Sequence, residues 1–349
     1  MNIKLYFRVL IVAQFWVLFG FSYANQDLFE KGRDYYYGMT QKQSFTQAKE
    51  FFQSSAEEGN LEAMTALGIM YSEGKGVTRD DKKALRYLND AAKQNHPKAI
   101  YILGVLNYQG IGIERNTDEA KKLFKTAAEL GNLDAQFSLY GIYNNDPESK
   151  LLADKWLISA ADMGHAGAQF KLGEKLFLSK DYGEALISLN KGSNVNDAAN
   201  IYLYLIHLNG LTVRNNKALA MSIIGKVKDQ EKIFQYANNF LNKKEDLNHQ
   251  FALYLFRILR DRGNLDAYLA IANMYEEGIV VKKDFKRAYN FVIAAARKGH
   301  IPSQKKVVDM YINGVGTQKS KSKSVYWLKK LIQSGDLEAK ERLSSLEKG

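Results

Sequence analysis

The chain has 349 residues, of which 49 are Lys or Arg and 38 are Asp or Glu, and it contains three prolines and no cysteine. The lack of cysteine excludes a disulfide framework, a thiolate nucleophile and a sulfur-ligated metal site. The net charge of +11 favours acidic partners or anionic surfaces. Because Lys and Asp/Glu are interspersed along the chain, no nucleic-acid partner is expected.

Residues 1–24 have the layout of a secretory signal peptide. The segment begins with two positive charges, continues with the apolar run VLIVAQFWVLFGF (9–21) and ends in small residues. This run is shorter than the roughly 18–20 residues that a membrane-spanning helix needs. We expect cleavage between Ala24 and Asn25, a periplasmic or secreted chain, and no membrane span after cleavage. An uncleaved anchor is the alternative.

The rest of the chain repeats with a period of 36 residues. Each repeat begins at a corner residue, followed four positions on by Ala and eight positions on by a large aliphatic residue. Offsets 4, 8, 11 and 12 from the corner fall on one face of a helix. This self-similarity predicts stacked helical hairpins, each burying its apolar face against its neighbours. The clearest corners are Gly59, Asn95, Gly131, Gly263, Gly299 and Gly335.

Each predicted hairpin has recognisable helix ends. A glycine at offset 15, such as Gly74 or Gly110, is expected to adopt positive φ and end the first helix. Asp80, Asn116 and Asp284 lie where the N-cap of the second helix belongs. The pattern predicts second helices over residues 82–92, 118–128 and 286–296.

The repeats are not equally regular. We expect one solenoid over residues 25–349, with regular units at about 60–195 and 263–335. A polar closing helix is predicted at 337–347. Residues at about 226–250 have lost the glycines but keep a helical composition. That stretch is either a bend or joint between two stacks, or drift without consequence.

Residues 63–92 read AMTALGIMYSEGKGVTRDDKKALRYLNDAA. This segment resembles a Sel1-like repeat, the 36-residue relative of the tetratricopeptide repeat, and the resemblance covers most of residues 27–335. It implies an all-α fold, an α/α superhelical solenoid of about nine helix pairs. Members of such families act as adaptors or scaffolds. Exported bacterial members are associated with envelope assembly, signalling, host-cell interaction or the neutralisation of secreted toxic effectors.

No motif in the chain indicates chemistry. His96, His165 and His300 each follow a corner residue, so the repeat spaces them too widely to share a metal. Ser72 and Lys75 have SxxK spacing, but no KTG partner motif occurs. The GxG turns follow helices and lack the third glycine of a dinucleotide loop. We therefore expect no catalytic, cofactor or metal site, and no enzyme activity.

A partner surface is expected on the first helices, which line the concave face in tetratricopeptide-like solenoids. Mapping the repeat places this face at offsets 3, 6, 10, 13 and 14. An apolar stripe with polar edges is typical of a groove for a peptide or partner helix. The alternative is that these side chains are ordinary core. The candidate partner-binding residues are Tyr101, Tyr108, Phe137, Phe170, Phe177, Ile201 and Leu208.

The sequence thus predicts a non-catalytic scaffold or adaptor, periplasmic or secreted, that binds a protein along its concave face. The basic charge favours an acidic partner. Two alternatives stay open: a periplasmic immunity protein that neutralises a secreted toxic effector, and an envelope-associated, cell-wall-associated or host-interaction factor.

Overall fold

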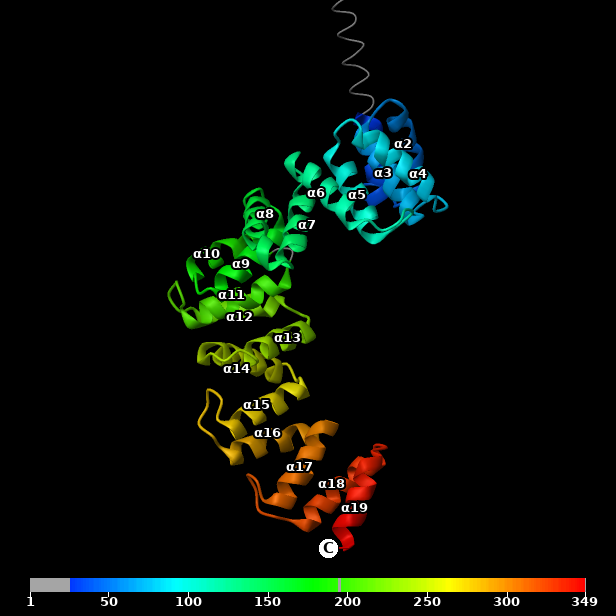
Figure 1. The fold of residues 1–349 in the computed structure, drawn as a ribbon. Coiled ribbons are helices and arrows are strands. Elements are labelled where there is room, and N and C mark those ends of the chain that lie inside the picture. Colours follow the sequence, from blue (N-terminus) through cyan, green and yellow to red (C-terminus); the bar gives the residue numbers. More distant parts are fainter. Residues whose placement is uncertain (1–25, 194–195, 349) are drawn as a thin grey trace, which may run out of the picture. The chain divides into compact units, whose positions relative to one another are not determined.

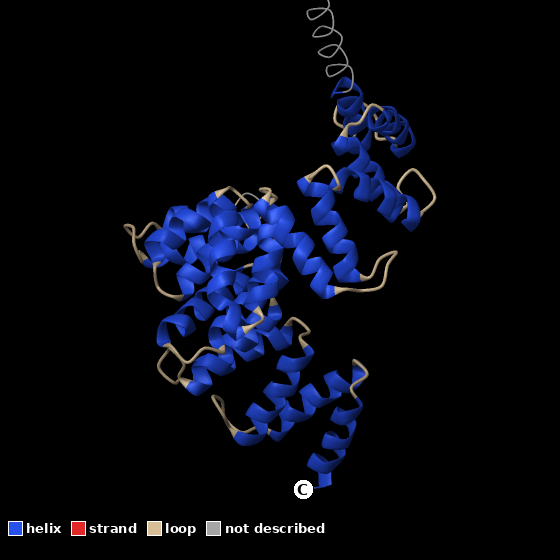
Figure 2. Cartoon of the chain, turned by 45° about the horizontal axis from the view of Figure 1, so that its top comes forward, coloured by secondary structure: helices blue, strands red, loops and turns tan. Residues whose placement is uncertain are grey.

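The computed structural model describes residues 26–193 and 196–348, in which every regular element is helical (Figure 1 and Figure 2). The predicted all-α solenoid is confirmed. The signal-peptide prediction concerns residues outside this range. Within it, no helix combines the length and the apolar character that crossing a membrane requires.

The chain forms two compact units, which meet in the sequence between Leu176 and Phe177. This boundary lies outside the irregular stretch 226–250. Within each unit, successive helices pack against one another in chain order, as stacked hairpins do.

Unit 1 is built from hairpins of short helices. In chain order these are a helix over residues 26–37, α2 (Phe45–Glu57), α3 (Leu61–Glu73), α4 (Asp81–Ala92), α5 (Pro97–Gln109), α6 (Thr117–Glu129), α7 (Leu133–Asn144), the 3-10 turn η1 (Pro147–Ser149), α8 (Lys150–Asp162) and α9 (Ala166–Leu178), whose last residues belong to unit 2.

Unit 2 continues the same alternation of first and second helices. It contains α10 (Tyr182–Gly192), α11 (Asp197–Asn209), α12 (Lys217–Lys226), α13 (Gln230–Leu241), α14 (Asp246–Asp261), α15 (Leu265–Glu277), α16 (Phe285–Arg297), α17 (Ile301–Asn313), α18 (Lys321–Gln333) and α19 (Leu337–Lys348).

The helix ends follow the predicted chemistry. Gly74 and Gly110 have φ of 70° and 73° and end α3 and α5 in the left-handed conformation. The side chains of Asp80, Asn116 and Asp284 accept hydrogen bonds from backbone N–H groups in the first turns of α4, α6 and α16. These caps satisfy backbone donors that the helix itself leaves unpaired.

The second glycine of the GxG loop has a different role, which is to let neighbouring repeats touch. A Cβ added to Gly76 would lie 2.6 Å from the backbone of Phe45, at the start of the preceding second helix. A Cβ at Gly316 would overlap the carbonyl of Phe285 in the same way. The loop of one repeat therefore rests on the second helix of the repeat before it.

The core of each hairpin follows the repeat pattern. Ala63, Ala99 and Ala135, all at offset 4, are fully buried, as are Leu67 and Leu139 at offset 8. Alanine allows close helix packing, and each buried leucine contributes about 1.5–3 kcal/mol. The hairpins are thus held by a regular apolar seam, which leaves the exposed positions free to vary.

Candidate partner-binding site

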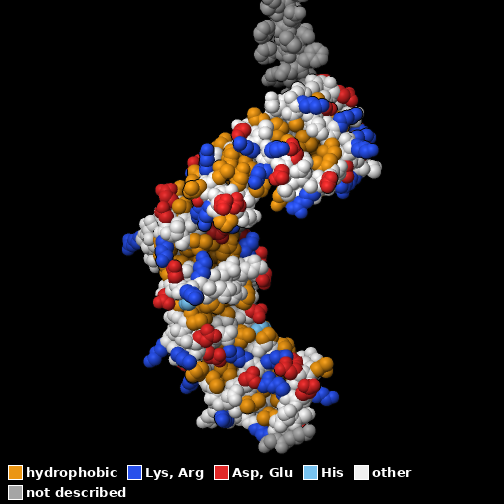
Figure 3. All heavy atoms as spheres, in the orientation of Figure 1, with side chains coloured by type: hydrophobic (Ala, Val, Ile, Leu, Met, Phe, Trp, Pro, Cys, Tyr) orange, Lys and Arg blue, Asp and Glu red, His pale blue; other side chains and the backbone are white. Residues whose placement is uncertain are grey.

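An open cleft lies between the first helices of two adjacent repeats in unit 1. We call it the α5–α7 cleft. It has a volume of about 410 Å³ and is walled mainly by aromatic and aliphatic side chains. In Figure 3, hydrophobic side chains gather at the surface over α3 and α5. The cleft residues are Tyr101, Val105, Tyr108 and Gln109 of α5, Phe124 of α6, and Ser138, Gly141 and Ile142 of α7.

Gly141 lines the hollow and adds no side chain to it. It lies at offset 10, which is occupied by Val105 in the preceding repeat and by Ile69 in the one before that. A Cβ added to Gly141 meets no atom within 4 Å. The α5–α7 cleft therefore has no side chain at a position where the neighbouring repeats carry one.

Two tyrosines supply the polar character of the cleft. The ring of Tyr101 lies 5.7 Å from that of Phe124, and burial raises the pKa of the Tyr101 phenol, with a smaller opposing effect of its hydrogen bond with Ser138. Tyr108 is 43% exposed, and the guanidinium of Arg115 lies 5.6 Å from its ring centre. Tyr101 is therefore an uncharged hydrogen-bonding group at neutral pH.

A second cleft, of about 420 Å³, lies at the N-terminal end of unit 1. Tyr36 and Tyr37 line it, and Tyr37 is 62% exposed. Lys98 of α5 also lines this cleft and lies one helical turn before Tyr101 in the sequence. This cleft was not predicted from the sequence, where the adjacent tyrosines 36 and 37 are the signal that could have found it.

Only two of the seven predicted site residues line the α5–α7 cleft together, namely Tyr101 and Tyr108. The expectation of an exposed stripe is wrong for Phe170, Phe177 and Ile201, which are 5%, 2% and 0% exposed. Phe177 belongs to an aromatic cluster of unit 2, with its ring 4.8 Å from that of Tyr202 and 5.4 Å from that of Phe251. These residues are core.

Phe137 and Leu208 are half-buried and lie outside the cleft. The ring of Phe137 packs 4.7 Å from the imidazole of His165 in the following repeat. For both residues, a role in partner binding stays a prediction.

In three repeats, the side chain at offset 6 contacts a residue at the corner of the following repeat. Thr65 bonds His96 at 2.9 Å, Phe137 contacts His165, and Lys305 bonds Asp336 at 2.8 Å. Tyr101 is also at offset 6 but lines the α5–α7 cleft, together with Ser138 at offset 7 and Gly141 at offset 10.

The equivalent face of unit 2 carries charged side chains in place of aromatic and aliphatic ones. A hollow of about 480 Å³ is lined by Glu276, Lys305, Lys306 and Asp309, among others. Lys306 Nζ donates to Glu276 Oε2 at 2.7 Å and to Asn273 Oδ1 at 2.6 Å. Its polar groups are therefore already paired within the chain.

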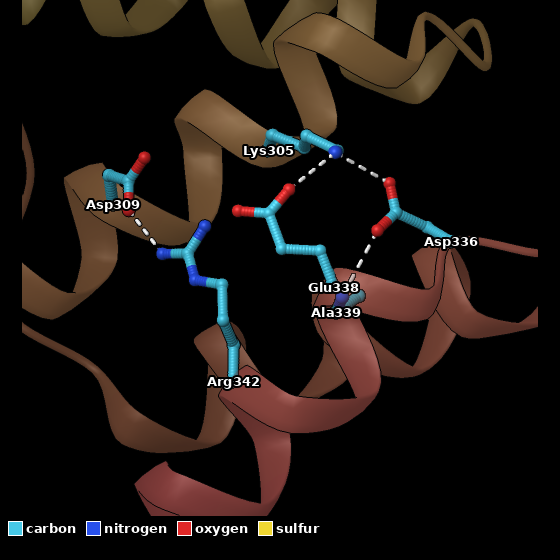
Figure 4. Close-up of polar contacts among 6 residues, drawn as sticks. All are labelled: Lys305, Asp309, Asp336, Glu338, Ala339 and Arg342. Atoms are coloured by element: carbon cyan, nitrogen blue, oxygen red, sulfur yellow. Dashed lines mark hydrogen bonds and ion pairs between the residues drawn. The ribbon is translucent and has the colours of Figure 1, made fainter.

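The last helix joins this network (Figure 4). Lys305 Nζ lies 2.8 Å from both Asp336 Oδ2 and Glu338 Oε2, and Arg342 of α19 pairs with Asp309 of α17. The hydrogen bond from Lys305 lowers the pKa of Asp336. Ion pairs thus link α19 to the preceding first helix.

The corner histidines each contact an acidic residue of the preceding repeat. The imidazole Nε2 lies 3.7 Å from Glu62 for His96, 3.3 Å from Asp134 for His165, and 3.0 Å from Asp266 for His300. In the part of the chain that is described, no three His, Asp or Glu side chains are grouped as metal ligands. These histidines join neighbouring repeats.

The chain matches the Sel1 repeat over residues 29–60, 61–96, 97–132, 136–165, 265–300 and 309–336. A search of curated proteins gave no match. Among solved structures, a protective antigen of uropathogenic Escherichia coli with an SLR fold is 19% identical, with a TM-score of 0.51, over 93% of this chain and 80% of that one. At this identity, the likeness concerns the fold alone.

Two further solved structures are similar over parts of the chain. A Sel1 repeat protein of Oxalobacter formigenes is 23% identical, covering 92% of this chain and 87% of that one, with a TM-score of 0.42. An immunity protein of Pseudomonas aeruginosa is 18% identical, covering 56% and 81%, with a TM-score of 0.42.

Proposed function

The chain belongs to the Sel1 repeat family, and from this premise we propose that it is a non-catalytic scaffold holding a segment of a partner protein in the α5–α7 cleft. The observation that carries the proposal is the cleft itself. It is an open hollow of about 410 Å³ with apolar walls and a glycine where other repeats have a side chain. Such a hollow accepts an apolar anchor from a partner, since burial of that anchor supplies the binding free energy.

The walls indicate the chemistry of the anchor. Tyr101 and Tyr108 offer ring faces and hydroxyl groups, and tyrosine is enriched among residues that dominate interface energies. Arg115 is stacked over Tyr108 and pairs with no carboxylate in the described residues, so its donors are available. We infer a segment with an aromatic or leucine side chain next to an acidic residue, because a guanidinium binds carboxylates in a bidentate manner.

The place of action is inferred from the N-terminal sequence. The signal-peptide pattern of residues 1–24 supports export to the periplasm or beyond. Mass spectrometry of the protein recovered from its native host tests this, and the expected N-terminus is Asn25. A protein that keeps residues 1–24 would contradict it.

The sharpest test fills the cleft without disturbing the fold. Gly141→Leu places a side chain into the hollow, and a helix former in place of glycine is expected to stabilise α7 by about 1 kcal/mol. Residues 25–349 would be expressed in the periplasm of the native host with and without this change. Captured proteins would then be identified by mass spectrometry and quantified.

We expect a stoichiometric partner of the unmodified chain that is lost with Gly141→Leu and with Tyr101→Ala combined with Tyr108→Ala. Leu151→Ala is the control, since Leu151 is 87% exposed in unit 1 but lies outside the cleft. Equal capture by all variants would refute the cleft as the binding site.

The identity of the partner decides between the biological roles. A toxic effector would make the chain an immunity protein, which protection of cells from that effector directed to the periplasm would establish. Retention on the cell-wall fraction, with no protein partner, would instead indicate an envelope component and refute the scaffold proposal.

A further inference from the structure

A strongly basic region lies in the last regular repeats of unit 2. Residues 282–330 contain eleven lysines and two arginines but only two acidic residues, Asp284 and Asp309. By contrast, residues 26–176 contain 19 basic and 21 acidic residues. The positive charge of the chain is therefore concentrated here.

Many of these cations are not neutralised by the protein. Lys305 and Lys306 are held in the ion pairs described above, and Arg287 pairs with Asp284 at 3.3 Å. A further set is exposed and forms no ion pair with any residue that the structure describes. We call it the basic edge: Lys282, Lys283, Lys286, Lys319 and Lys321.

Packing brings the two halves of the basic edge together. Lys283 and Lys319 lie 36 residues apart, at the same position of consecutive repeats. The loop at Gly316 rests on the backbone of Phe285 and on Tyr289. The loops that precede α16 and α18 lie on the same side of unit 2 (Figure 1). The lysines therefore share one border of the protein.

Apolar side chains lie among these lysines. Phe285 is 42% exposed, with Lys283 Nζ 4.9 Å from its ring centre, and Tyr326 of α18 is 54% exposed. The loop 279–281 (Ile-Val-Val) is half-buried just before the basic edge. Aromatic and aliphatic groups beside lysines suit the boundary between lipid headgroups and acyl chains.

The backbone of this loop is a second, independent observation. Val280 has φ of 61°, a left-handed conformation that β-branched residues rarely adopt. The equivalent positions of other repeats are Gly76, Gly112 and Gly316. An apolar side chain is thus kept at a site where glycine suits the backbone better, and strain of this kind is often found at functional surfaces.

We propose that the basic edge and Phe285 bind the surface of an anionic phospholipid bilayer. Lysine outnumbers arginine eleven to two in this region. Lysine acts as a flexible point charge suited to mobile headgroups, whereas arginine is preferred for the bidentate contacts of nucleic-acid or phosphoprotein recognition. The proposal is independent of the α5–α7 cleft, which lies in unit 1.

The test is co-sedimentation of residues 25–349 with vesicles rich in phosphatidylglycerol, compared with vesicles of phosphatidylcholine alone. We expect binding to the anionic vesicles that weakens with salt, since surface charges are screened. Changing Lys282, Lys283, Lys319 and Lys321 to Gln should weaken it by more than about a hundredfold, at about fivefold for each lysine. Phe285→Ala should cause a smaller loss that persists at high salt.

A matched control removes the same charge elsewhere. Lys42, Lys82, Lys93 and Lys125 are exposed in unit 1, and changing them to Gln should leave vesicle binding nearly intact. Gly141→Leu should also leave it intact, which separates this proposal from the proposed function. Three outcomes would overturn the proposal. The first is an equal loss of vesicle binding in both lysine variants, and the second is equal binding to neutral vesicles. The third is binding to a DNA duplex or an acidic protein but not to vesicles.

Discussion

Equivalent positions of the repeat hold opposite chemistry in the two units. In unit 1, offsets 10 and 13 of α5 are Val105 and Tyr108, and they face Ser138 and Gly141 across an open cleft. In unit 2, the same positions of α15 are Asn273 and Glu276, and Lys306 of α17 bonds to both. The repeat fixes which positions meet. The side chains then decide whether the hollow between them is lined by apolar groups or by charged groups that are paired within the chain.

The two units also differ in net charge. Residues 26–176 are almost neutral, with 19 basic and 21 acidic residues, whereas residues 177–349 hold 28 basic and 17 acidic residues. The prediction of an acidic partner used the charge of the whole chain. The distribution indicates two surfaces with different chemistry, one apolar in unit 1 and one basic in unit 2.

The largest expected effect is a difference in stability between a variant of the core and a variant of the cleft. Phe177→Ala should lower the free energy of unfolding by about 3–5 kcal/mol, because it opens a cavity in the aromatic cluster. Tyr108→Ala should change it by no more than about 0.5 kcal/mol, as is usual for exposed residues. Urea unfolding followed by circular dichroism measures both. Similar losses would mean that Tyr108 is core and that the cleft is not a free surface.

A second experiment rebuilds the chemistry of unit 2 in unit 1. Tyr108→Glu combined with Ser138→Lys places a carboxylate and an ammonium group at the positions of Glu276 and Lys306. The new pair should bridge the cleft and weaken partner binding by at least about thirtyfold, corresponding to the loss of an interface hot spot of about 2 kcal/mol. Titration calorimetry with the identified partner measures this. Unchanged affinity would show that the side chains at positions 108 and 138 do not control whether the partner enters the cleft.

A third experiment asks how much the ion pair between Lys306 and Glu276 in unit 2 contributes to stability. Lys306→Met and Glu276→Gln, alone and together, form a double-mutant cycle. Their coupling should be about 0.5–1 kcal/mol, since both side chains are partly exposed, and it should shrink at high salt. A coupling near zero at low salt would mean that these ion pairs fill the face without stabilising it.

The smallest expected effect is a pH dependence at the seam between repeats in unit 1. Burial lowers the pKa of His96; Lys98 acts in the same direction, and Glu62 opposes it. The folded chain therefore favours the neutral imidazole of His96. Its contribution to stability is complete above the unfolded-state pKa of about 6.5. This contribution is lost as the pH falls through that pKa and then through the lowered pKa of the folded state. The urea midpoint should therefore fall between about pH 7 and about pH 5. His96→Gln should reduce this change, and an equal change in the variant would assign it to other groups.

The sequence by itself determined the architecture. A recurring 36-residue period, alanine and leucine at fixed offsets, cap residues such as Asp80 and helix-ending glycines such as Gly74 are local signals, so the regular hairpins could be predicted one by one. Tyr101 and Tyr108, two of the predicted partner-binding residues, line the α5–α7 cleft, and their role in binding stays a prediction.

Only the tertiary structure decided what lies between repeats. Helical periodicity shows which stripe of a helix is apolar, but not whether the next hairpin covers it, and so the sequence left Phe170 and Ile201 open as either groove or core. The partners of Lys306 lie 30 and 33 residues away, and a Cβ added to Gly141 would meet no atom within 4 Å. Such features arise from how neighbouring hairpins fit together, because packing depends on the shapes of two surfaces at once.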